Sequence, residues 1–344
     1  MAVGYQTFCK KMRDQQLSWK GNKLQEVKVE GTWAGKHYPF ILPRGQGEMN
    51  LWPGIRKDGK FPLAAYLNRT GVQAHKGRDH LLSSWTLCAN LYFPFGQDDE
   101  GKAVLAEFLR ARVDPRIRTV TAVELEFEDP NPELKPDALL GETDGSRGAN
   151  QTSPDVAFLV ELDGGRPGLV LTEVKFTEHS FYDCSARRKR RAAKQSAPCG
   201  DMAKLLASPV TECPQHVDLK RRYWDHLTKA FNGPGLSQCP AAKGGYQLFR
   251  QQALAEGLAI SGKYGLVVSA VAWDERNPSL MRSLARAGVG DIAKDWATHF
   301  MKAKAAYKTF THQEWANWVG SVAVLSGKTW LSNWAEYSRL RYGL

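Results

Sequence analysis

Two carboxylates and one ammonium group near the ends of two neighbouring predicted strands have the clearest chemical potential in this sequence. Asp155 opens an apolar run at 156–162, and Glu173 and Lys175 lie near the end of a second run that starts at Leu169. A glycine-rich turn between the runs predicts a hairpin. Residues two apart on a strand project from the same face. We therefore expect Glu173 and Lys175 to point together, with Asp155 beside them.

These three side chains suit the metal-dependent hydrolysis of a phosphodiester. Charged groups at the ends of buried strands are costly to desolvate unless they pair or bind a metal. Asp155 and Glu173 supply the oxygen ligands that Mg²⁺ prefers, with Mn²⁺ as the alternative ion. A metal held there polarises a phosphodiester, and Lys175 could orient water and stabilise developing charge. The alternative is a surface hairpin with a salt-bridged Glu–Lys pair.

The distribution of charge along the chain is consistent with a bound cation near these residues. The 344 residues carry a formal net charge of +11, which favours a polyanionic partner. Residues 101–183 carry −7, and residues 184–250 carry +9. Acidic residues repel an anionic ligand unless a cation such as a divalent metal lies between them. A solvated acidic patch explains the pattern equally well.

The spacing of apolar residues predicts the elements that position this hairpin. Residues 1–74 are rich in glycine, lysine and aromatic residues, and we expect short strands and loops there. The further expected elements are a helix at 80–92 capped by Asp79, a helix at 102–112, a strand at 119–128, the hairpin, a helix at 246–258, a strand at 264–273, and helices from about residue 278 onward.

Pro154-Asp155, followed after 17 intervening residues by Glu173-Val174-Lys175, resembles the signature of the PD-(D/E)xK nuclease superfamily. The order of predicted elements agrees with the core of that superfamily. More narrowly, several segments resemble a family of bacterial restriction endonucleases, and together they cover roughly residues 37–275. These segments are His80-Leu81-Leu82-Ser83-Ser84, Cys88-Ala89-Asn90, Glu126-Phe127-Glu128, Glu173-Val174-Lys175-Phe176-Thr177-Glu178 and Tyr246-Gln247-Leu248.

The resemblance implies an α/β fold with a restriction endonuclease-like core, in which helices flank a mixed central sheet. It implies metal-dependent phosphodiester hydrolysis, with Asp155 and Glu173 as metal ligands and Lys175 as the base-like catalytic group. The corresponding domains are an N-terminal extension at 1–74, a nuclease core at 75–277 that carries a basic, cysteine-containing insertion at 184–243, and a helical C-terminal region at 278–344.

Five further polar residues are candidates for the same site. Glu126, on the polar face of its strand, is either a third metal ligand or a solvated side chain. His80 either approaches the metal or a phosphate, or packs at the start of its helix. Glu178 is expected just outside the metal ligands. Gln247 and Arg250 share one helix face, where they either position substrate and water or form a plain amphipathic surface.

A run of basic residues follows the hairpin. Such a run neutralises backbone phosphates and makes binding steeply dependent on salt. Nuclear import and a solvated loop are the alternatives. The candidate nucleic-acid-binding residues are Arg187, Arg188, Lys189, Arg190, Arg191 and Lys194.

Four of the six cysteines, Cys184, Cys199, Cys213 and Cys239, lie in the same region. Four thiolates could bind a structural Zn²⁺ or, as in some nucleases of this superfamily, an iron–sulfur cluster. The spacing contains no CxxC pair, so free buried thiols are the simpler expectation. No secretory signal is visible, so we expect no disulfides and a cytoplasmic protein.

These features predict a Mg²⁺-dependent endodeoxyribonuclease, and the resemblance adds a role in bacterial restriction or anti-phage defence. A non-catalytic nucleic-acid-binding protein on the same fold is one alternative, and a structure-selective or RNA-directed nuclease is another. The expected partners are DNA, a second copy of the chain in a homodimer, and a defence-system partner protein. No apolar window approaches the length of a membrane-spanning helix, so we expect no membrane partner.

Overall fold

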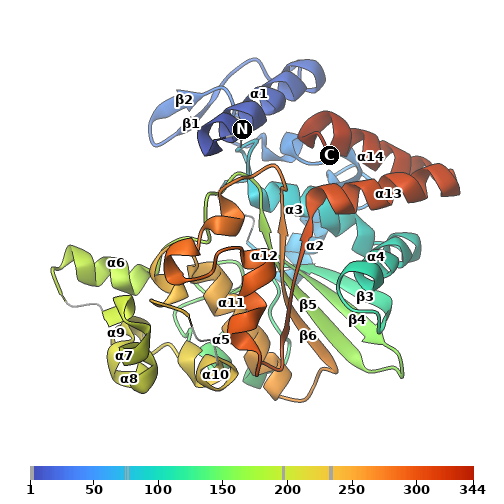
Figure 1. Ribbon diagram of the computed structural model, residues 1–344. Helices are drawn as coiled ribbons and strands as arrows, with labels where there is room; N and C mark the ends of the chain where they lie inside the picture. Colours follow the sequence, from blue (N-terminus) through green and yellow to red (C-terminus); the bar gives the residue numbers. More distant parts are fainter. Residues whose placement is uncertain (1–3, 74, 76, 196–197, 232–234) are drawn as a thin grey trace.

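Across residues 4–344, without 74, 76, 196–197 and 232–234, the computed structural model has a five-stranded mixed sheet with helices on both faces (Figure 1). In spatial order the strands are β3 (Ile117–Leu125), β4 (Val156–Leu162), β5 (Pro167–Lys175), β6 (Leu266–Trp273) and β7 (Ala306–Thr311). Strands β3, β4 and β5 are antiparallel neighbours, and β5, β6 and β7 are parallel neighbours. The expected α/β fold with a mixed central sheet is confirmed.

A small hairpin stands apart from this sheet and consists of β1 (Gly31–Trp33) and β2 (Lys36–Tyr38). The helices are α1 (Tyr5–Lys23), α2 (Leu63–Thr70), α3 (Ser84–Tyr92), α4 (Asp99–Arg112), α5 (Pro136–Leu140), α6 (Ser185–Ala192), α7 (Met202–Ala207), α8 (Pro209–Glu212), α9 (Pro214–Leu219), α10 (Tyr223–Ala230), α11 (Tyr246–Ile260), α12 (Ile292–Asp295), α13 (His312–Ser326) and α14 (Thr329–Tyr342).

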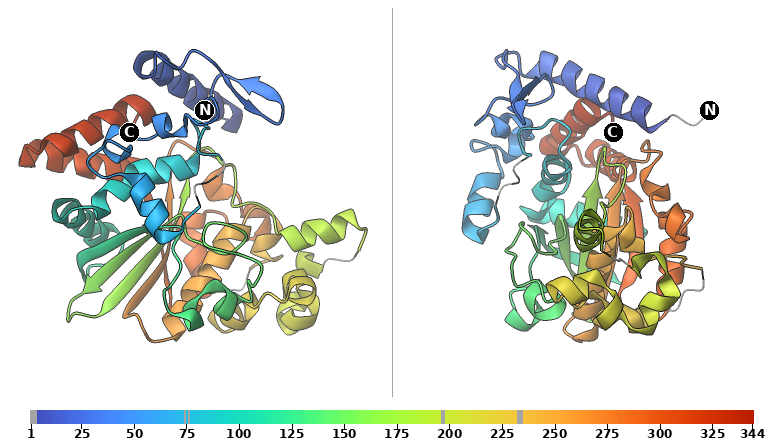
Figure 2. Two further views of the ribbon diagram at one scale, coloured as in Figure 1. Left: turned by 180° about the vertical axis from the view of Figure 1, so that it is seen from behind. Right: turned by 90° about the vertical axis from the view of Figure 1, so that its left-hand side faces the viewer.

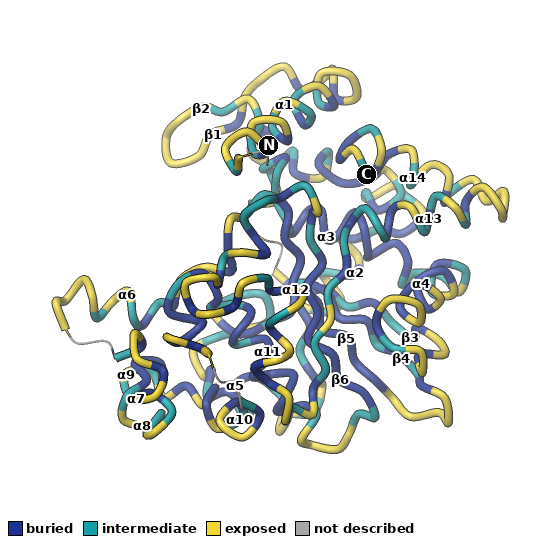
Figure 3. Tube along the Cα trace, viewed as in Figure 1, coloured by how far each residue is buried: buried dark blue, intermediate teal, exposed yellow. Residues whose placement is uncertain are grey.

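Buried apolar side chains cover both faces of the sheet, and the central strands β5 and β6 are coloured mostly as buried in Figure 3. On one face, Val156 and Val170 pack in a core shared with α3, α4, α13 and α14. On the other face, Leu171 and Val267 pack in a core shared with α10 and α11. Strands that are buried on both sides need apolar residues at successive positions, which explains the continuous apolar runs of β5 and β6.

Helix α3 begins four residues later than the sequence predicted. His80 instead forms an isolated bridge with Ile41. The cap is Ser83 rather than Asp79, since the Ser83 side chain accepts a hydrogen bond of 3.2 Å from the backbone N–H of Thr86. This turn therefore brings His80 beside the segment that follows the β1–β2 hairpin.

The N-terminal region does not consist of short strands and loops alone, because it also contains α1 and α2. Helix α1 buries only Phe8, Met12, Gln16 and Trp19. These residues form a narrow stripe of about one side chain per turn, and one of them is polar. Such a stripe has little hydrophobic periodicity to detect.

The expectation of helices alone after about residue 278 was also wrong, because β7 lies between α12 and α13. Strand β7 pairs in parallel with β6 at the edge of the sheet. Most of its residues are only partly buried, and its polar composition lacks the apolar run by which β6 was recognised.

The first and last helices lie side by side although they are far apart in the sequence (Figures 1 and 2). The side chain of Gln16 in α1 donates a hydrogen bond of 2.7 Å to the carbonyl oxygen of Arg341 in α14. Both helices contribute buried residues to the core that also covers one face of the sheet. The domain boundaries at residues 74 and 277 stay predictions.

Candidate active site

Adjacent ends of β4 and β5 bring Asp155, Glu173 and Lys175 together. Asp155 directly precedes β4, and Glu173 and Lys175 are among the last three residues of β5. The backbone N–H of Val174 donates to Asp155 Oδ2 at 2.7 Å, and the Val174 side chain packs in the core on the opposite face. The expected juxtaposition is present, and the chemical roles of the three residues stay predictions.

Lys175 is a buried ammonium group that donates to two acceptors. Its side chain is 3% exposed, and Nζ lies 2.6 Å from Glu173 Oε1 and 3.0 Å from Gln247 Oε1. Burial lowers the pKa of Lys175, but the negative charges of Glu173, Glu178 and Asp155 outweigh burial and raise the pKa above its ordinary value. Lys175 is thus a protonated donor here, suited to stabilising negative charge.

Glu126 directly follows β3 and has an unusual backbone conformation. Its φ is +49°, in the left-handed region that costs a non-glycine residue conformational energy. The Glu126 N–H donates to the carbonyl oxygen of Asp155 at 3.1 Å. Arg147 Nε donates to the Glu126 carbonyl oxygen at 2.7 Å. These contacts hold the strained backbone, which presents the carboxylate beside Asp155.

The carboxylates at this site repel one another. Burial raises the pKa of Glu126 to about 8, and the charge on Glu173 adds to the rise. Burial and then Glu173 also raise the pKa of Asp155 well above its ordinary value. A divalent cation relieves such repulsion and prefers oxygen ligands, so the chemistry of these donors fits Mg²⁺. Their arrangement does not by itself form a site, because among the described residues no group of three or more His, Cys, Asp or Glu side chains is placed so that it could hold a metal ion.

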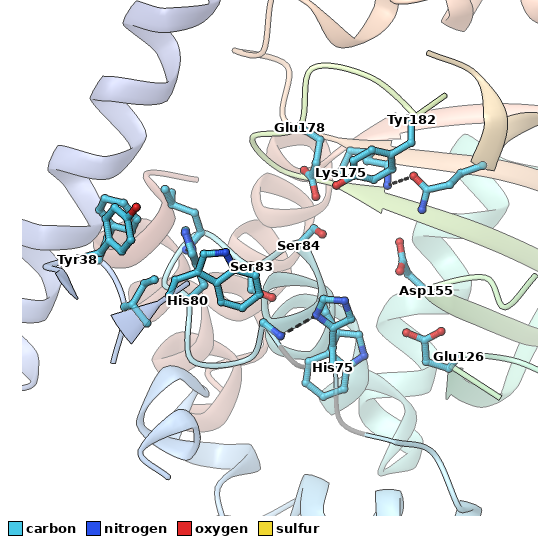
Figure 4. A pocket seen from close by; sticks show the side chains of 17 residues that line it. Tyr38, His75, His80, Ser83, Ser84, Glu126, Asp155, Lys175, Glu178 and Tyr182 are labelled. Atoms are coloured by element: carbon cyan, nitrogen blue, oxygen red, sulfur yellow. Dashed lines mark hydrogen bonds between the residues drawn. The ribbon is translucent and has the colours of Figure 1, made fainter. Parts of the chain in front are cut away.

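Glu126, Asp155 and Lys175 open onto a cavity of about 450 Å³. Figure 4 shows the Asp155 and Glu126 carboxylates beside each other on one side of the cavity, with Tyr38 and His80 on the opposite side. Glu173 is 4% exposed, does not line the cavity and accepts the hydrogen bond from Lys175.

Three of the other candidate residues line this cavity: His80, Glu178 and Gln247. His80 Nδ1 accepts the backbone N–H of Leu82 at 3.0 Å, and burial lowers the pKa of His80 to about 4, so the ring is neutral. Glu178 accepts the backbone N–H of Phe176 at 2.8 Å. Gln247 lies on α11, where it orients Lys175.

Arg250 lies one turn further along α11 and does not line the cavity. Its guanidinium carbon is 5.4 Å from the centre of the Tyr246 ring. Its positive charge lowers the raised pKa of Glu126. Arg250 therefore acts on the carboxylates electrostatically from outside the cavity.

The basic run forms α6, an exposed helix that projects from the body of the molecule (Figure 3). Arg190 forms an ion pair with Asp218 at 2.6 Å, and Arg187 Nη1 donates to the carbonyl oxygen of Ala242 at 2.7 Å. These contacts join α6 to other parts of the insertion. The exposed basic residues of the run are Arg188, Lys189, Arg191 and Lys194.

The four clustered cysteines are buried and have free thiols. Cys239 donates its backbone N–H to the carbonyl oxygen of Cys199 at 2.9 Å. Burial raises the pKa of Cys239, and the thiols of Cys213, Cys199 and Cys184 add to the rise. The cysteines therefore lie in one neighbourhood. In the described part of the chain they do not form a ready metal centre, and a Zn²⁺ or iron–sulfur site stays a prediction.

His312, which the sequence did not indicate as a site residue, supports the end of β5 from the C-terminal region. His312 Nε2 lies 2.9 Å from the carbonyl oxygen of Lys175, and Nδ1 lies 2.9 Å from the Tyr92 hydroxyl. No local pattern links positions 137 residues apart. The capping box of Thr311 and Glu314 marks the start of α13 but says nothing of this contact.

The chain matches the protein family described as Restriction Endonuclease associating with ARP over residues 10–343. It therefore belongs to this family, and its mixed sheet with flanking helices is consistent with a restriction-endonuclease-like core. The family indicates a nuclease. No curated protein and no solved structure matches the chain. None of the helices in the described residues is long and apolar enough to span a membrane.

Proposed function

We propose that the protein is a Mg²⁺-dependent endodeoxyribonuclease of the PD-(D/E)xK superfamily that acts in the cytoplasm in bacterial restriction or anti-phage defence. The observation that carries this proposal is the convergence of Glu126, Asp155 and Lys175 on one cavity, with the buried carboxylate of Glu173 hydrogen-bonded to Lys175. Mutually repelling carboxylates beside a buried ammonium group favour a cation and a phosphate as the missing partners. Membership of a restriction-endonuclease family supports the same chemistry.

Asp155, Glu126 and Glu173 are the residues that would hold Mg²⁺, or Mn²⁺ in its place. Such an ion supplies Lewis-acid polarisation of the scissile phosphate. The Val174 N–H fixes one oxygen of Asp155, and this leaves the other oxygen to face the cavity. Glu173 shares its charge with Lys175 through the 2.6 Å hydrogen bond.

Lys175 is placed to stabilise the charge that develops on the phosphate. Glu173 and Gln247 orient its Nζ, so little reorganisation is needed when the charge forms. His312 holds the Lys175 carbonyl oxygen and so fixes the backbone at this point. Gln247 keeps an amide nitrogen that can donate to the substrate or to the attacking water.

The exposed basic residues of α6 are our proposed contacts to the DNA backbone. Phosphate contacts of this kind position the substrate and carry no sequence information. A cut in both strands would require a second active site or two successive nicks, which makes a homodimer attractive. The description of the family names association with ARP, and this wording supports our expectation of a partner protein.

The central test is a cleavage assay with Mg²⁺ or Mn²⁺ on paired, single-stranded and branched DNA and on RNA. Lys175→Ala is expected to lose cleavage by at least about a hundredfold, the scale of removing one preorganised electrostatic donor, while DNA binding persists. Lys302→Ala, at an exposed position in the loop before β7, is the control and is expected to cleave like the wild type.

Undiminished cleavage by Lys175→Ala contradicts the site assignment. Binding without cleavage in the wild type favours the non-catalytic alternative on the same fold. Preferred cleavage of RNA or branched DNA favours the structure-selective or RNA-directed alternative. Metal analysis of the purified protein decides separately whether the clustered cysteines hold Zn²⁺ or an iron–sulfur cluster.

A further inference from the structure

The side of the cavity that faces the carboxylates is aromatic. In the β1–β2 hairpin, Trp33 pairs with Lys36, and Gly31 pairs with Tyr38. Paired residues of an antiparallel ladder lie on the same face, as do residues two apart. Trp33, Lys36 and Tyr38 therefore share one face, and Trp33 and Tyr38 line the cavity.

The hairpin holds these side chains in a defined register. Ala34 and Gly35 form a two-residue turn in which both φ angles are positive, at +49° and +77°, as the turn type that suits a tight hairpin requires. The Gly31 N–H donates to the carbonyl oxygen of Ile41 at 2.8 Å. This contact joins the hairpin to the segment that borders α3.

A series of rings extends from the hairpin into the cavity. The Tyr38 and Phe40 rings are 5.3 Å apart, and the Phe40 and His80 rings are 5.1 Å apart. The neutral state of His80 makes its ring a weakly polar surface. Figure 4 shows Tyr38 and His80 on the side of the cavity opposite the carboxylates, with His75 between the two sides in this view. Trp33, Tyr38, Phe40 and His80 together form an aromatic wall of the cavity.

Two rings at this cavity are unusually exposed. Trp33 is 58% exposed and Tyr182, on the side of Lys175, is 53% exposed. An exposed tryptophan is costly in water and is enriched where a partner covers it. Its neighbour on the hairpin face, Lys36, adds a positive charge, so the surface matches a ligand that combines a flat ring with negative charge.

We propose that the aromatic wall stacks the base of a nucleotide adjoining the scissile phosphate, so the substrate is a DNA strand that is unpaired at the cleavage position. This inference rests on the proposed nuclease function. A phosphate at Asp155 and Glu126 directs the attached nucleoside across the cavity toward the wall. In paired duplex both faces of a base are covered by its neighbours, and an enzyme gains access only to a single strand or to a flipped nucleotide.

The test uses the full-length protein in EDTA and DNA strands that each carry one 2-aminopurine. Stacking against an aromatic ring quenches the fluorescence of this base analogue. The wild type is expected to quench it in single strands, to a smaller extent beside a mismatch, and not in fully paired duplex. Trp33→Leu is expected to lose the quenching and to bind single strands about tenfold more weakly, as for the loss of one base–aromatic stack.

Trp33→Phe is the matched control, since it keeps a ring and is expected to keep most of the quenching. Tyr38→Leu with Tyr38→Phe repeats the comparison on the second strand of the hairpin. Equal quenching in single-stranded and fully paired DNA overturns the inference, and this result needs only the wild type. Wild-type quenching and affinity in both leucine variants overturn it as well.

The measurement is independent of catalysis because EDTA removes the metal. Quenching by the aromatic wall without any Mg²⁺-dependent cleavage contradicts the nuclease proposal and leaves the stacking surface supported. Cleavage of paired duplex without quenching in single strands supports the nuclease and overturns the substrate class.

Discussion

At the scale of single residues, the buried carboxylates of the candidate site destabilise the folded protein when no metal is bound. Glu126 and Asp155 both have raised pKa values because they are buried and face Glu173. The folded protein without a metal therefore holds carboxylates that would be more stable in water. Residues that are unfavourable for folding concentrate where function requires them.

Asp155→Asn is expected to stabilise the metal-free protein while it removes activity. The amide keeps an oxygen that accepts the Val174 N–H, but it removes one repelling charge. We expect the free energy of unfolding in EDTA to rise by about 1 kcal/mol, measured by urea denaturation. Excess Mg²⁺ should stabilise the wild type by roughly 2–3 kcal/mol at a hundredfold excess over its dissociation constant. A variant that is equally stabilised by Mg²⁺ would contradict the role of Asp155 as a ligand.

Because His312 is buried as a neutral ring, we expect the free energy of unfolding to fall in acid. Burial lowers its pKa from 6.5 to about 4, although Asp274 and the Lys175 carbonyl oxygen oppose this shift. Below pH 6.5 the His312 ring is protonated in the unfolded chain, whereas in the folded chain it stays neutral until the pH falls to about 4. The free energy of unfolding therefore falls as the pH drops through this window, by up to about 3 kcal/mol for this group.

The measurement for His312 is denaturation at a series of pH values between 7 and 4 in wild type and His312→Gln. The variant is expected to be less stable at pH 7 and to lose part of the acid slope. His37→Gln, at an exposed position of β2, serves as the control and should keep the wild-type slope. An unchanged slope in His312→Gln would show that other groups cause the acid sensitivity.

At the scale of elements, the sequence predicted what local patterns encode. Strands β4, β5 and β6 were predicted because each is a short, nearly continuous apolar run, and helix α11 because of its long, largely apolar sequence. Helix α1 was missed because its buried side includes Gln16. Strand β7 was missed because a half-exposed edge strand has no apolar run.

The candidate site also has one part that local sequence patterns indicate and one part that depends on packing between distant elements. Asp155, Glu173 and Lys175 could be predicted together because one hairpin joins them. The contact of His312 with Lys175 and the facing of the aromatic wall toward the carboxylates depend on how distant elements pack. No spacing along the chain encodes those distances, so this half of the site required the structure.

We expect the exposed basic residues of α6 to make a salt-dependent contribution to DNA affinity. Arg188→Ala combined with Lys189→Ala removes two exposed charges and leaves the Arg190–Asp218 ion pair in place. The slope of log affinity against log salt concentration should decrease by about two, since each lost phosphate contact contributes about 0.9. Fluorescence anisotropy with labelled DNA measures the slope.

The charge-matched control for α6 is Lys302→Ala combined with Lys304→Ala, in the loop before β7, where both side chains are exposed. The control is expected to keep the wild-type slope. The rate of cleavage at saturating DNA should be unchanged in the α6 variant, because these residues lie outside the cavity. An equal loss of slope in both variants would mean that net charge, and not α6, controls binding.

At the scale of the whole molecule, the N-terminal helix α1 and the C-terminal helix α14 pack in the same hydrophobic core. The carbonyl oxygens of Tyr342 and Gly343 accept hydrogen bonds of 2.8 Å and 3.2 Å from Arg276. Arg276 follows β6 and also pairs with Asp274. The C-terminal helix is thus tied to the sheet close to the end of β5, and the N-terminal helix is tied to the C-terminal helix.

The buried guanidinium of Arg341 in α14 joins this helix to α1 and to the segment that contains Asn50. It is 0% exposed and donates to the backbone and side-chain oxygens of Asn50 and to the Tyr337 hydroxyl. Its guanidinium carbon lies 4.3 Å from the centre of the Trp19 ring. In the described residues no carboxylate pairs with it, so neutral acceptors and ring faces alone compensate its desolvation.

Arg341→Ala is therefore expected to lower the free energy of unfolding by roughly 3–5 kcal/mol, because it leaves buried acceptors unpaired and opens a cavity between α1 and α14. Arg341→Lys should recover only part of this loss, since an ammonium group cannot reach the acceptors and the ring at once. Arg339→Ala is the matched control on the same helix, where the arginine is exposed and pairs with Glu336, and its unfolding midpoint should equal that of the wild type. Unfolding in urea, followed by fluorescence and by circular dichroism, also shows whether the ends and the sheet unfold together. A single coincident transition that shifts in Arg341→Ala is expected, whereas separate transitions would mean that the terminal helices form an independent unit.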